Sequence, residues 1–283
     1  MTDLSGRTVL VTGGSSGIGL AASERLAALG ADLVLVARDP ARLESAAAAV
    51  RSHSRSGTVS TLPCDLSSQA AVRALSAQVR ERYPHLHVLV NNAGGVGRTR
   101  ALTEDGIERT FAVNHLAPYL LTRLLLDRLK ESAPARVITV SSEAHRHADL
   151  DLDDLGLARG YSIMKAYGRS KLANVLFTRE LARRLAGTGV TANCLHPGTV
   201  ATQIWSGAPT FVKPLLAVAK LFMLSAEEGA LTLVHLASSP EVERLTGAYL
   251  EKERETEPAP RARDEALAQR LWEVSARLTG LDP

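Results

Sequence analysis

Residues 7–19 read RTVLVTGGSSGIG, an apolar run that passes directly into a glycine-rich turn. Residues 8–11 predict a buried strand, and the residues after the turn have helical apolar spacing. Glycines let a backbone approach a pyrophosphate closely, and the free N–H groups of the following helix bind its charge. The stretch therefore predicts a dinucleotide site rather than a glycine turn without a ligand. The candidate residues in this turn are Gly13, Ser15, Ser16, Gly17, Ile18 and Gly19.

The rest of the chain repeats the alternation of strand and helix. Strands are predicted near residues 8–11, 33–36, 59–62, 88–90, 137–140 and 191–195, with a short one near 248–250. Such alternation is typical of an α/β, doubly wound parallel sheet, the Rossmann fold, with its ligand at the carboxyl ends of the strands. No linker interrupts the pattern, so one domain is expected over residues 1–283.

Tyr167 and Lys171 lie four residues apart in the string YGRSK, within a stretch of helical spacing. This interval places both side chains on one helix face. A nearby ammonium stabilises a phenolate, so Lys171 is expected to lower the pKa of Tyr167 and to make it an acid or base for carbonyl chemistry. Tyr161 and Lys165 form a second pair with the same spacing.

Ordered motifs carry a resemblance that spans nearly the whole chain. After the glycine turn come Asp65-Leu66, Asn91-Asn92-Ala93-Gly94, Asn114, Ser141-Ser142, Tyr167 to Lys171, and His196-Pro197-Gly198-Thr199. The set resembles the short-chain dehydrogenase/reductase family. The strings FAVNHL (111–116), SSEAH (141–145) and SKLAN (170–174) are most similar to its retinol dehydrogenase-type branch.

The resemblance implies a catalytic set of Asn114, Ser142, Tyr167 and Lys171. Tyr167 exchanges a proton with the substrate oxygen, Ser142 hydrogen-bonds that oxygen, and Asn114 anchors a water relay to Lys171. The second serine of the pair matches the catalytic position in the family, which leaves Ser141 a structural role. An acidic insertion at residues 145–160 lengthens the interval between Ser142 and Tyr167 beyond that of most members.

The same resemblance implies the cofactor contacts. Asp65 and Leu66 border the adenine, whereas Asn91, Ala93 and Gly94 line the nucleotide cleft. Tyr167 and Lys171 also face the cofactor, with Lys171 on the ribose. At the nicotinamide end the candidates are Pro197, Gly198, Thr199 and, more weakly, Thr202, with His196 packed nearby.

Cofactor choice depends on the end of the second predicted strand, residues 35–39, which read LVARD. An acid directly after the strand would bind the adenosine ribose of NAD, whereas an Arg pairs with a 2′-phosphate. Ala37 stands at the position of such an acid and Arg38 follows, so NADP(H) is predicted, with NAD(H) as the alternative. Asp39 would reverse the argument after a shift of one residue, and Arg38 could instead pair with a neighbouring carboxylate.

Residues 200–225 are strongly apolar, and their large side chains include Trp205, Phe211, Leu221 and Phe222. They predict a substrate flap that closes over a lipophilic carbonyl or alcohol, although they could also pack on the body of the protein or on a second subunit. Retinoids, steroids, long-chain aldehydes, quinones and polyketide-like ketones all fit. A C-terminal helix near residues 263–278 is expected to dock on the core or on a neighbour, which leaves a homo-oligomer open.

Composition excludes several classes of protein. Thirty-three basic against thirty acidic residues, with 4% aromatics and no basic run, give no reason to expect nucleic acid binding. The N-terminus lacks the features of a signal peptide, and no stretch reaches the about 20 apolar residues of a membrane span. Cys64 and Cys194 are expected to be buried, reduced thiols, which favours a cytoplasmic location.

No metal site is predicted. The acids Asp149, Asp151, Asp153 and Asp154 lack the glycine and glutamate spacing of a calcium loop, and His145 and His147 have no third ligand at zinc spacing.

Two hypotheses from different functional classes follow. The first is an NADP(H)-dependent oxidoreductase that acts on a lipophilic carbonyl or alcohol, with reduction as the favoured direction. The alternative is a non-catalytic NADP(H)-sensing regulatory protein, because a fold alone does not establish turnover.

Overall fold

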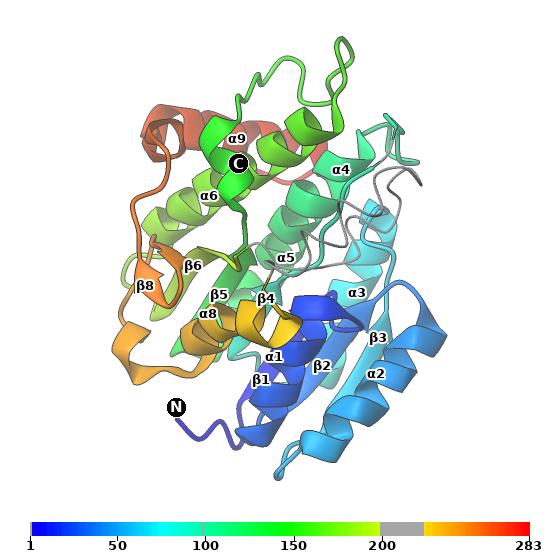
Figure 1. The fold of residues 1–283 in the computed structure, drawn as a ribbon, viewed down its shortest axis with the longest axis vertical. Coiled ribbons are helices and arrows are strands. Elements are labelled where there is room, and N and C mark those ends of the chain that lie inside the picture. The colour runs from blue at the N-terminus through cyan, green and yellow to red at the C-terminus, as the bar shows by residue number, and fades with distance from the viewer. Residues whose placement is uncertain (1, 98, 199–223) are drawn as a thin grey trace.

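The centre of the molecule is an eight-stranded sheet with the order β3-β2-β1-β4-β5-β6-β7-β8 (Figure 1). The computed structural model describes residues 2–97, 99–198 and 224–283. From β3 to β7 neighbouring strands are parallel, and β8 pairs antiparallel with β7. The doubly wound parallel sheet is therefore confirmed. Its strands are β1 (Thr8–Thr12), β2 (Asp32–Ala37), β3 (Val59–Pro63), β4 (Val88–Asn91), β5 (Ala135–Val140), β6 (Val190–His196), β7 (Tyr249–Glu251) and β8 (Arg254–Glu255).

The order of the strands reverses between β1 and β4. In open α/β sheets the carboxyl ends of two such strands border a crevice where ligands bind. The glycine turn follows β1 and the Asn-Asn-Ala-Gly string begins in β4. The topology thus brings together two motifs that are about 80 residues apart in the chain.

β8 was not predicted from the sequence. It has two residues, both exposed, and follows Lys252 and Glu253, whose φ angles of 50° and 61° turn the chain back on β7. Two polar residues carry neither an apolar run nor a glycine turn, which are the signals that identify a hairpin.

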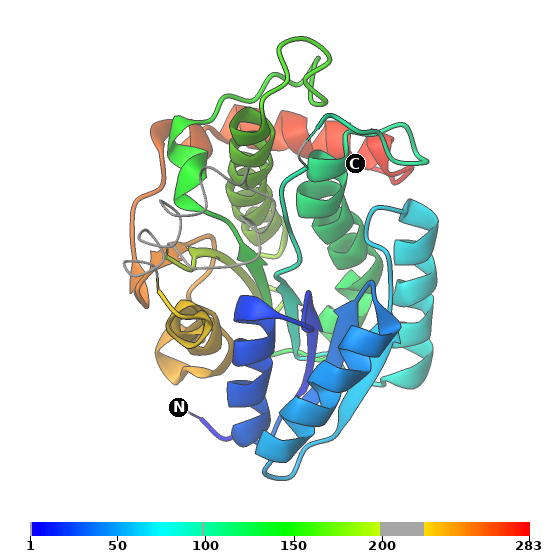
Figure 2. The ribbon, with the colours of Figure 1, turned by 45° about the vertical axis from the view of Figure 1, so that its right-hand side comes forward.

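Helices cover both faces of the sheet (Figure 2). One face packs under α1 (Gly17–Ala28), α2 (Pro40–His53) and α8 (Ala226–Ser238), with α1 and α8 side by side. The other packs under α3 (Gln69–Arg82), α5 (Ala117–Glu131) and α6 (Ile163–Arg184). Strand side chains alternate between these layers, as Val9 and Val11 do on one side and Leu10 on the other.

The last helix, α9 (Glu265–Leu278), forms an outer layer on α5 and α6. Its Trp272 ring lies 5.0 Å from that of Tyr119 on α5, and the Arg184 guanidinium of α6 lies 4.4 Å over the same indole. The sequence predicted that this helix docks either on the core of its own chain or on a neighbouring subunit, and in the structure it docks on its own core.

Short helical segments lie in the connections between these elements. They are α4 (Arg109–Phe111), the π-helical turn η1 (Ala112–Leu116) and the 3-10 turns η2 (Glu143–His147), η5 (Pro240–Val242) and η6 (Pro260–Arg263). The predicted flap falls outside the described residues except for its end, where Ser225 caps α8 in a capping box with Glu228. Among the helices that the structure describes, none has the length and apolar character to cross a membrane.

Candidate active site

The glycine turn leaves no room for side chains at two of its positions. A Cβ on Gly19 would lie 2.3 Å from the Gly13 carbonyl oxygen, and a Cβ on Gly13 would lie 2.9 Å from the Ala93 Cα. Gly13 also has φ of +70°, and its N–H donates to the Val36 carbonyl over 2.7 Å. Only glycine allows this close packing of the turn against β2 and the end of β4.

The turn leads into α1 with an N-terminus suited to an anion. Helix α1 begins at Gly17, directly after the exposed and extended Ser16, and no acidic residue occupies its first turn. Ile18 is buried against the core, which orients this end of the helix. The first N–H groups and the positive end of the helix dipole therefore point to the cradle where a pyrophosphate would bind.

Two polar residues that the sequence analysis did not single out hold the cradle closed. The Thr12 hydroxyl donates to the Val90 carbonyl over 3.2 Å and accepts from the N–H groups of Asn92 (3.0 Å) and Ala93 (3.1 Å). The Asn92 amide donates to the Thr12 carbonyl over 2.9 Å. Thr12 adjoins the glycine turn and Asn92 lies within the Asn-Asn-Ala-Gly string, but their pairing crosses about 80 positions of sequence and so has no local signal.

The residues of the Asn-Asn-Ala-Gly string point in different directions. Asn91 is buried and its amide donates to the Thr122 hydroxyl on α5 over 2.9 Å, so its side chain faces the helix layer rather than the nucleotide crevice. Gly94 lies where a Cβ would be 3.2 Å from the Asn114 oxygen and 3.4 Å from the Lys171 ammonium. Gly94 therefore lies between the glycine turn and two of the predicted catalytic residues.

At the end of β2, the structure separates the roles of Arg38 and Asp39. Asp39 is the N-cap of α2, and its carboxylate accepts from the N–H groups of Ala41 (3.0 Å) and Arg42 (3.2 Å). Arg38 is exposed directly after β2. A carboxylate that caps a helix already has hydrogen-bond donors, which leaves Arg38 as the side chain available to a ligand here.

Asp65 and Leu66 follow β3 and are half-buried. Burial alone would raise the pKa of Asp65, but hydrogen bonds from the N–H and hydroxyl of Ser67, together with the charges of Arg38 and Arg109, hold it below its ordinary value. Asp65 is thus a fixed negative charge near Arg38, beside the adenine position that the resemblance implies.

Tyr167 and Lys171 both lie on α6, and the Lys171 ammonium is 5.6 Å from the centre of the Tyr167 ring. Lys171 is buried and donates to the Val140 carbonyl over 2.9 Å, and this burial lowers the pKa of Lys171 to about 8. Tyr161 instead precedes α6 and Lys165 is exposed on it. The later pair thus contains the buried lysine, and the Lys171 ammonium lies 3.4 Å from the position of an added Cβ on Gly94.

The expectation that Lys171 lowers the pKa of Tyr167 is wrong for this structure. Burial raises the pKa of Tyr167 above its ordinary value, and the hydrogen bond with the Ser142 hydroxyl offsets only part of the rise. The ammonium lies over the ring and is bonded to Val140, so removal of the phenol from water dominates. Tyr167 is consequently a protonated phenol at neutral pH.

The hydroxyls of the two serines after β5 make different contacts. Ser141 is buried and its hydroxyl donates to the Lys171 carbonyl over 2.8 Å, which is a structural contact. Ser142 begins the turn η2, and its hydroxyl accepts from the Ala144 N–H over 3.3 Å and interacts with Tyr167. Ser142 is thus the serine placed to face a substrate oxygen.

Asn114 lies in the π-helical turn η1 and is buried. Its amide donates to the Gly95 carbonyl (2.9 Å) and the Ser170 hydroxyl (3.0 Å), and its oxygen accepts from the Gly95 N–H (2.9 Å). Because these contacts occupy the amide, any water relay to Lys171 would use the main chain of this turn rather than the side chain.

The acidic insertion folds against α6. Arg169 lies between Tyr167 and Lys171 in sequence and is buried, and its guanidinium donates to the carbonyls of Asp149 and Asp154. A charged side chain of α6 therefore fixes the insertion beside the catalytic pair.

At the nicotinamide end, His196 is buried at the last position of β6, and Pro197 and Gly198 follow it at the same edge. Thr199 and Thr202 lie outside the described residues. In the described part of the chain no group of three or more His, Cys, Asp or Glu side chains is arranged to hold a metal ion. Cys64 and Cys194 are both buried free thiols.

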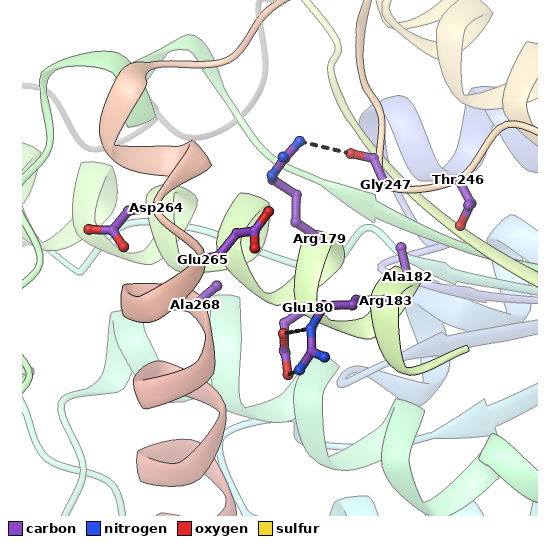
Figure 3. A pocket seen from close by; sticks show the side chains of 9 residues that line it. All are labelled: Arg179, Glu180, Ala182, Arg183, Thr246, Gly247, Asp264, Glu265 and Ala268. Atoms are coloured by element: carbon purple, nitrogen blue, oxygen red, sulfur yellow. Dashed lines mark hydrogen bonds and ion pairs between the residues drawn. The ribbon is translucent and has the colours of Figure 1, made fainter. Parts of the chain in front are cut away.

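A pocket of about 310 Å³ lies away from these residues, between the C-terminal half of α6, the β6 to β7 connection and α9 (Figure 3). Glu180 in its wall already pairs with Arg183 over 2.7 Å, and Arg179 donates to the Gly247 carbonyl. The pocket contains none of the predicted catalytic residues, and its Glu180 and Arg183 already form an ion pair.

Comparisons with known proteins agree with the predicted family. A family model described as short chain dehydrogenase matches residues 7–211. Human retinol dehydrogenase 14 is 44% identical over 98% of this chain and 87% of its own length. An uncharacterised protein from Mycobacterium paratuberculosis superposes with a TM-score of 0.82 at 33% identity, covering 100% of this chain and 96% of the other. A short chain dehydrogenase from Burkholderia cenocepacia J2315 in complex with NADP has a TM-score of 0.70 at 29% identity, covering 88% and 97%.

Proposed function

This chain belongs to the short-chain dehydrogenase/reductase family, in its retinol dehydrogenase-like branch, and we propose that it is an NADP(H)-dependent oxidoreductase of lipophilic carbonyl compounds and alcohols. One observation carries the proposal. Gly94, at the end of the nucleotide crevice, adjoins both Asn114 and Lys171, and Lys171 in turn adjoins Tyr167. A cofactor seated on the glycine turn would therefore reach the half-buried Tyr167 and the buried Lys171.

The residues present fit a nicotinamide dinucleotide. Added Cβ atoms at Gly13 and Gly19 would fill the cradle, and the N-terminus of α1 supplies unpaired N–H groups for the pyrophosphate. When bound, the nicotinamide supplies or accepts the hydride. The protein supplies the proton, the orientation of the substrate and the exclusion of water.

Tyr167 is the proton donor in the reductive direction. Its raised pKa keeps the phenol protonated at neutral pH, so it can donate a proton to a carbonyl oxygen as negative charge develops there. Ser142 donates a hydrogen bond to the same oxygen, and this bond strengthens as the charge grows. In the reverse direction Tyr167 must first lose its proton before it can accept one from an alcohol. Reduction is the proposed direction because a preference for NADP(H) usually accompanies a reducing role.

The preference for NADP(H) is supported by the end of β2. Arg38 is exposed and follows the last strand residue, whereas the Asp39 carboxylate caps α2. A guanidinium in this position can pair with a 2′-phosphate through charge-assisted hydrogen bonds. The Burkholderia cenocepacia structure is a complex with NADP, which is the same cofactor class.

The substrate class is supported by relatives and by composition. A relative 44% identical over nearly the full chain bears the name retinol dehydrogenase, and retinol is a lipophilic alcohol. Residues 200–223, in the interval between β6 and α8, are rich in large apolar side chains. We propose that they contact the apolar part of the substrate.

The test is to titrate the purified protein with NADPH and NADH, and then to follow nicotinamide absorbance with a panel of apolar aldehydes and ketones that includes retinal. We expect tighter NADPH binding and turnover of at least one apolar aldehyde. Tyr167→Phe should abolish turnover and preserve NADPH binding, while Tyr161→Phe, in the other Tyr–Lys pair, should retain turnover. Tight NADPH binding without turnover across the panel would contradict the proposal and favour a regulatory protein that senses NADP(H).

A further inference from the structure

We infer that His145 is a positioning residue that fixes the catalytic Ser142 through its backbone carbonyl and links it to residues 256–264, here called the C-terminal strap. The inference rests on the proposed function, because it assigns a task within the same site. The hydrogen-bond partners of its ring are backbone groups of Ser142 and Ala259, so it would act on a substrate through Ser142.

Both ring nitrogens of His145 have backbone partners. Nδ1 lies 2.7 Å from the Ser142 carbonyl oxygen, and Nε2 lies 3.1 Å from the Ala259 nitrogen. The imidazole is fully buried, and its ring centre is 4.8 Å from that of Tyr249. Burial also lowers the pKa of His145, which favours the neutral ring.

These two partners determine the tautomer of His145. The Ala259 N–H can only donate, so Nε2 must accept and carries no proton. The proton of the neutral ring is therefore on Nδ1 and is donated to the Ser142 carbonyl. A neutral imidazole is a rigid ring in which one nitrogen donates a hydrogen bond and the other accepts one, so it can join the Ser142 carbonyl to the Ala259 N–H.

The bond from Nδ1 restrains the turn that presents Ser142. The Ser142 carbonyl also accepts from the His145 N–H over 3.1 Å, and the Ser142 hydroxyl accepts from the Ala144 N–H over 3.3 Å. The peptide plane after Ser142 is thus held by two donors from one residue. Because displacement of a catalytic group by about 1 Å can cost about 100-fold in rate, this restraint bears on turnover.

The strap runs along the segment that follows Ser142 and is fastened to it at several points. Arg146 donates to the Glu257 carbonyl over 3.2 Å, Arg261 pairs with Asp149 over 2.8 Å, and Arg261 also donates to the Leu150 carbonyl over 3.3 Å. Figure 1 shows the strap between the β7–β8 hairpin and the last helix. These contacts join the strap to residues 146–150, whereas that of His145 joins it to Ser142 itself.

Two substitutions separate the two bonds. In His145→Asn the side-chain amide nitrogen can take the position of Nδ1 and keep the bond to Ser142, but it is too short to reach Ala259. In His145→Gln the longer amide oxygen can take the position of Nε2 and keep the bond from Ala259, but the Ser142 carbonyl loses its side-chain donor. Both variants lose the packing of the imidazole ring on Tyr249, so any effect of that loss should be similar in the two.

We expect His145→Gln to lower kcat by about tenfold or more, as loss of one restraining hydrogen bond implies, and His145→Asn to stay within about threefold of the wild type. NADPH binding should be unchanged in both, because neither bond touches the glycine turn. His147→Gln, an exposed histidine at the end of the same turn, is the control and should retain full kcat. Equal losses of kcat in the Asn and Gln variants, or a larger loss in Asn, would show that His145 only fills space.

A second measurement does not depend on the folding of any variant. In ¹⁵N-histidine NMR spectra of the wild-type protein, we expect the signals of His145 to show a proton on Nδ1 and none on Nε2. The Nε2-protonated tautomer would overturn the inference. Absence of turnover in the wild type would instead remove the proposed function, while turnover in the wild type with equal losses in the two variants removes only the role of His145.

Discussion

The nucleotide turn and the catalytic cluster lie at the same edge of the sheet but are built in opposite ways. The turn after β1 consists of backbone and empty space, with Gly13 and Gly19 in contact with carbonyl and Cα atoms. The predicted catalytic cluster combines buried Asn114 and Lys171 with half-buried Ser142 and Tyr167, and burial shifts the pKa values of both Tyr167 and Lys171. Substitutions in the turn should therefore act through steric overlap at every pH, whereas substitutions in the cluster should act through charge.

The largest expected effect in the nucleotide turn is that of Gly19→Ala. The added Cβ would lie 2.3 Å from the Gly13 carbonyl oxygen and 2.5 Å from the Asn92 amide nitrogen, so the cradle must open. Overpacking of this kind costs about 1–3 kcal/mol, and we expect NADPH affinity to fall by about 100-fold with a lower Tm. Isothermal titration and thermal unfolding measure the two effects.

Gly95→Ala is the matched control for the turn. A Cβ at Gly95 meets no atom within 4 Å among the described residues, and its φ is not in the left-handed region. We expect NADPH affinity and Tm close to those of the wild type. Equal changes of NADPH affinity and Tm in Gly19→Ala and Gly95→Ala would show that the nucleotide site does not depend on the absence of a side chain at Gly19.

Lys171→Met tests the opposite kind of construction. Turnover should fall by about 100-fold or more because proton transfer at Tyr167 loses its charged neighbour. The stability should rise at pH 7. The pKa of Lys171 is about 8 in the folded protein and 10.5 ordinarily, so folding weakens the binding of this proton. At pH 7, where Lys171 is charged, this lowers the stability of the folded protein by at most about 3 kcal/mol. Met removes that cost and keeps a chain of similar length.

The pH dependence of this gain has a defined sign. Between pH 8 and 10.5 the unfolded chain binds the Lys171 proton more tightly than the folded chain, so wild-type stability from this group increases with pH. The advantage of Lys171→Met in thermal unfolding should therefore shrink from pH 7 to pH 10. Lys165→Met, at an exposed position of the same helix, should change neither turnover nor Tm. A lower Tm for Lys171→Met at pH 7 would contradict the charge argument.

The difference between the two regions also explains what the sequence could predict. The strands, the glycine turn and the Tyr167–Lys171 spacing are local patterns, and the structure has each of them. By contrast, the hydrogen bonds between Thr12 and Asn92 join residues about 80 positions apart. His145 connects Ser142 to Ala259, which are 117 positions apart. Such contacts depend on the order of the strands and the path of the strap, which no local pattern records.

The direction of a pKa shift was likewise beyond the sequence. The spacing of Tyr167 and Lys171 correctly places them together, but whether the ammonium or the loss of water dominates depends on burial. Burial is set by η1, β5 and the turn after Ser142, which pack around the pair from distant parts of the chain. Spacing can thus predict proximity, and packing decides the electrostatic consequence.

Arg38→Ala is expected to have an intermediate effect on NADPH binding, because here a charged side chain, rather than close backbone packing, would contact the nucleotide. Loss of a charge-assisted bond to a 2′-phosphate should weaken NADPH binding by about 10- to 100-fold and leave NADH binding nearly unchanged. Arg42→Ala, an exposed arginine on the first turn of α2, is the control. Equal weakening of NADPH and NADH by Arg38→Ala would assign Arg38 to the fold rather than to cofactor choice.

The smallest expected effect is that of Asp39, and it decides whether the acid next to Arg38 takes part in cofactor choice. Because its carboxylate accepts from the Ala41 and Arg42 N–H groups, Asp39→Ala should cost about 1 kcal/mol of stability through loss of the helix cap. Asp39→Asn keeps a capping oxygen and should restore most of that stability. If Asp39 only caps α2, the ratio of NADPH to NADH affinity should stay within about threefold of the wild type in both variants, since an exposed charge is screened by solvent and salt. If Asn and Ala both shift the ratio strongly toward NADPH, Asp39 repels the 2′-phosphate in the native protein, and cofactor choice is then a balance between two adjacent residues of opposite charge.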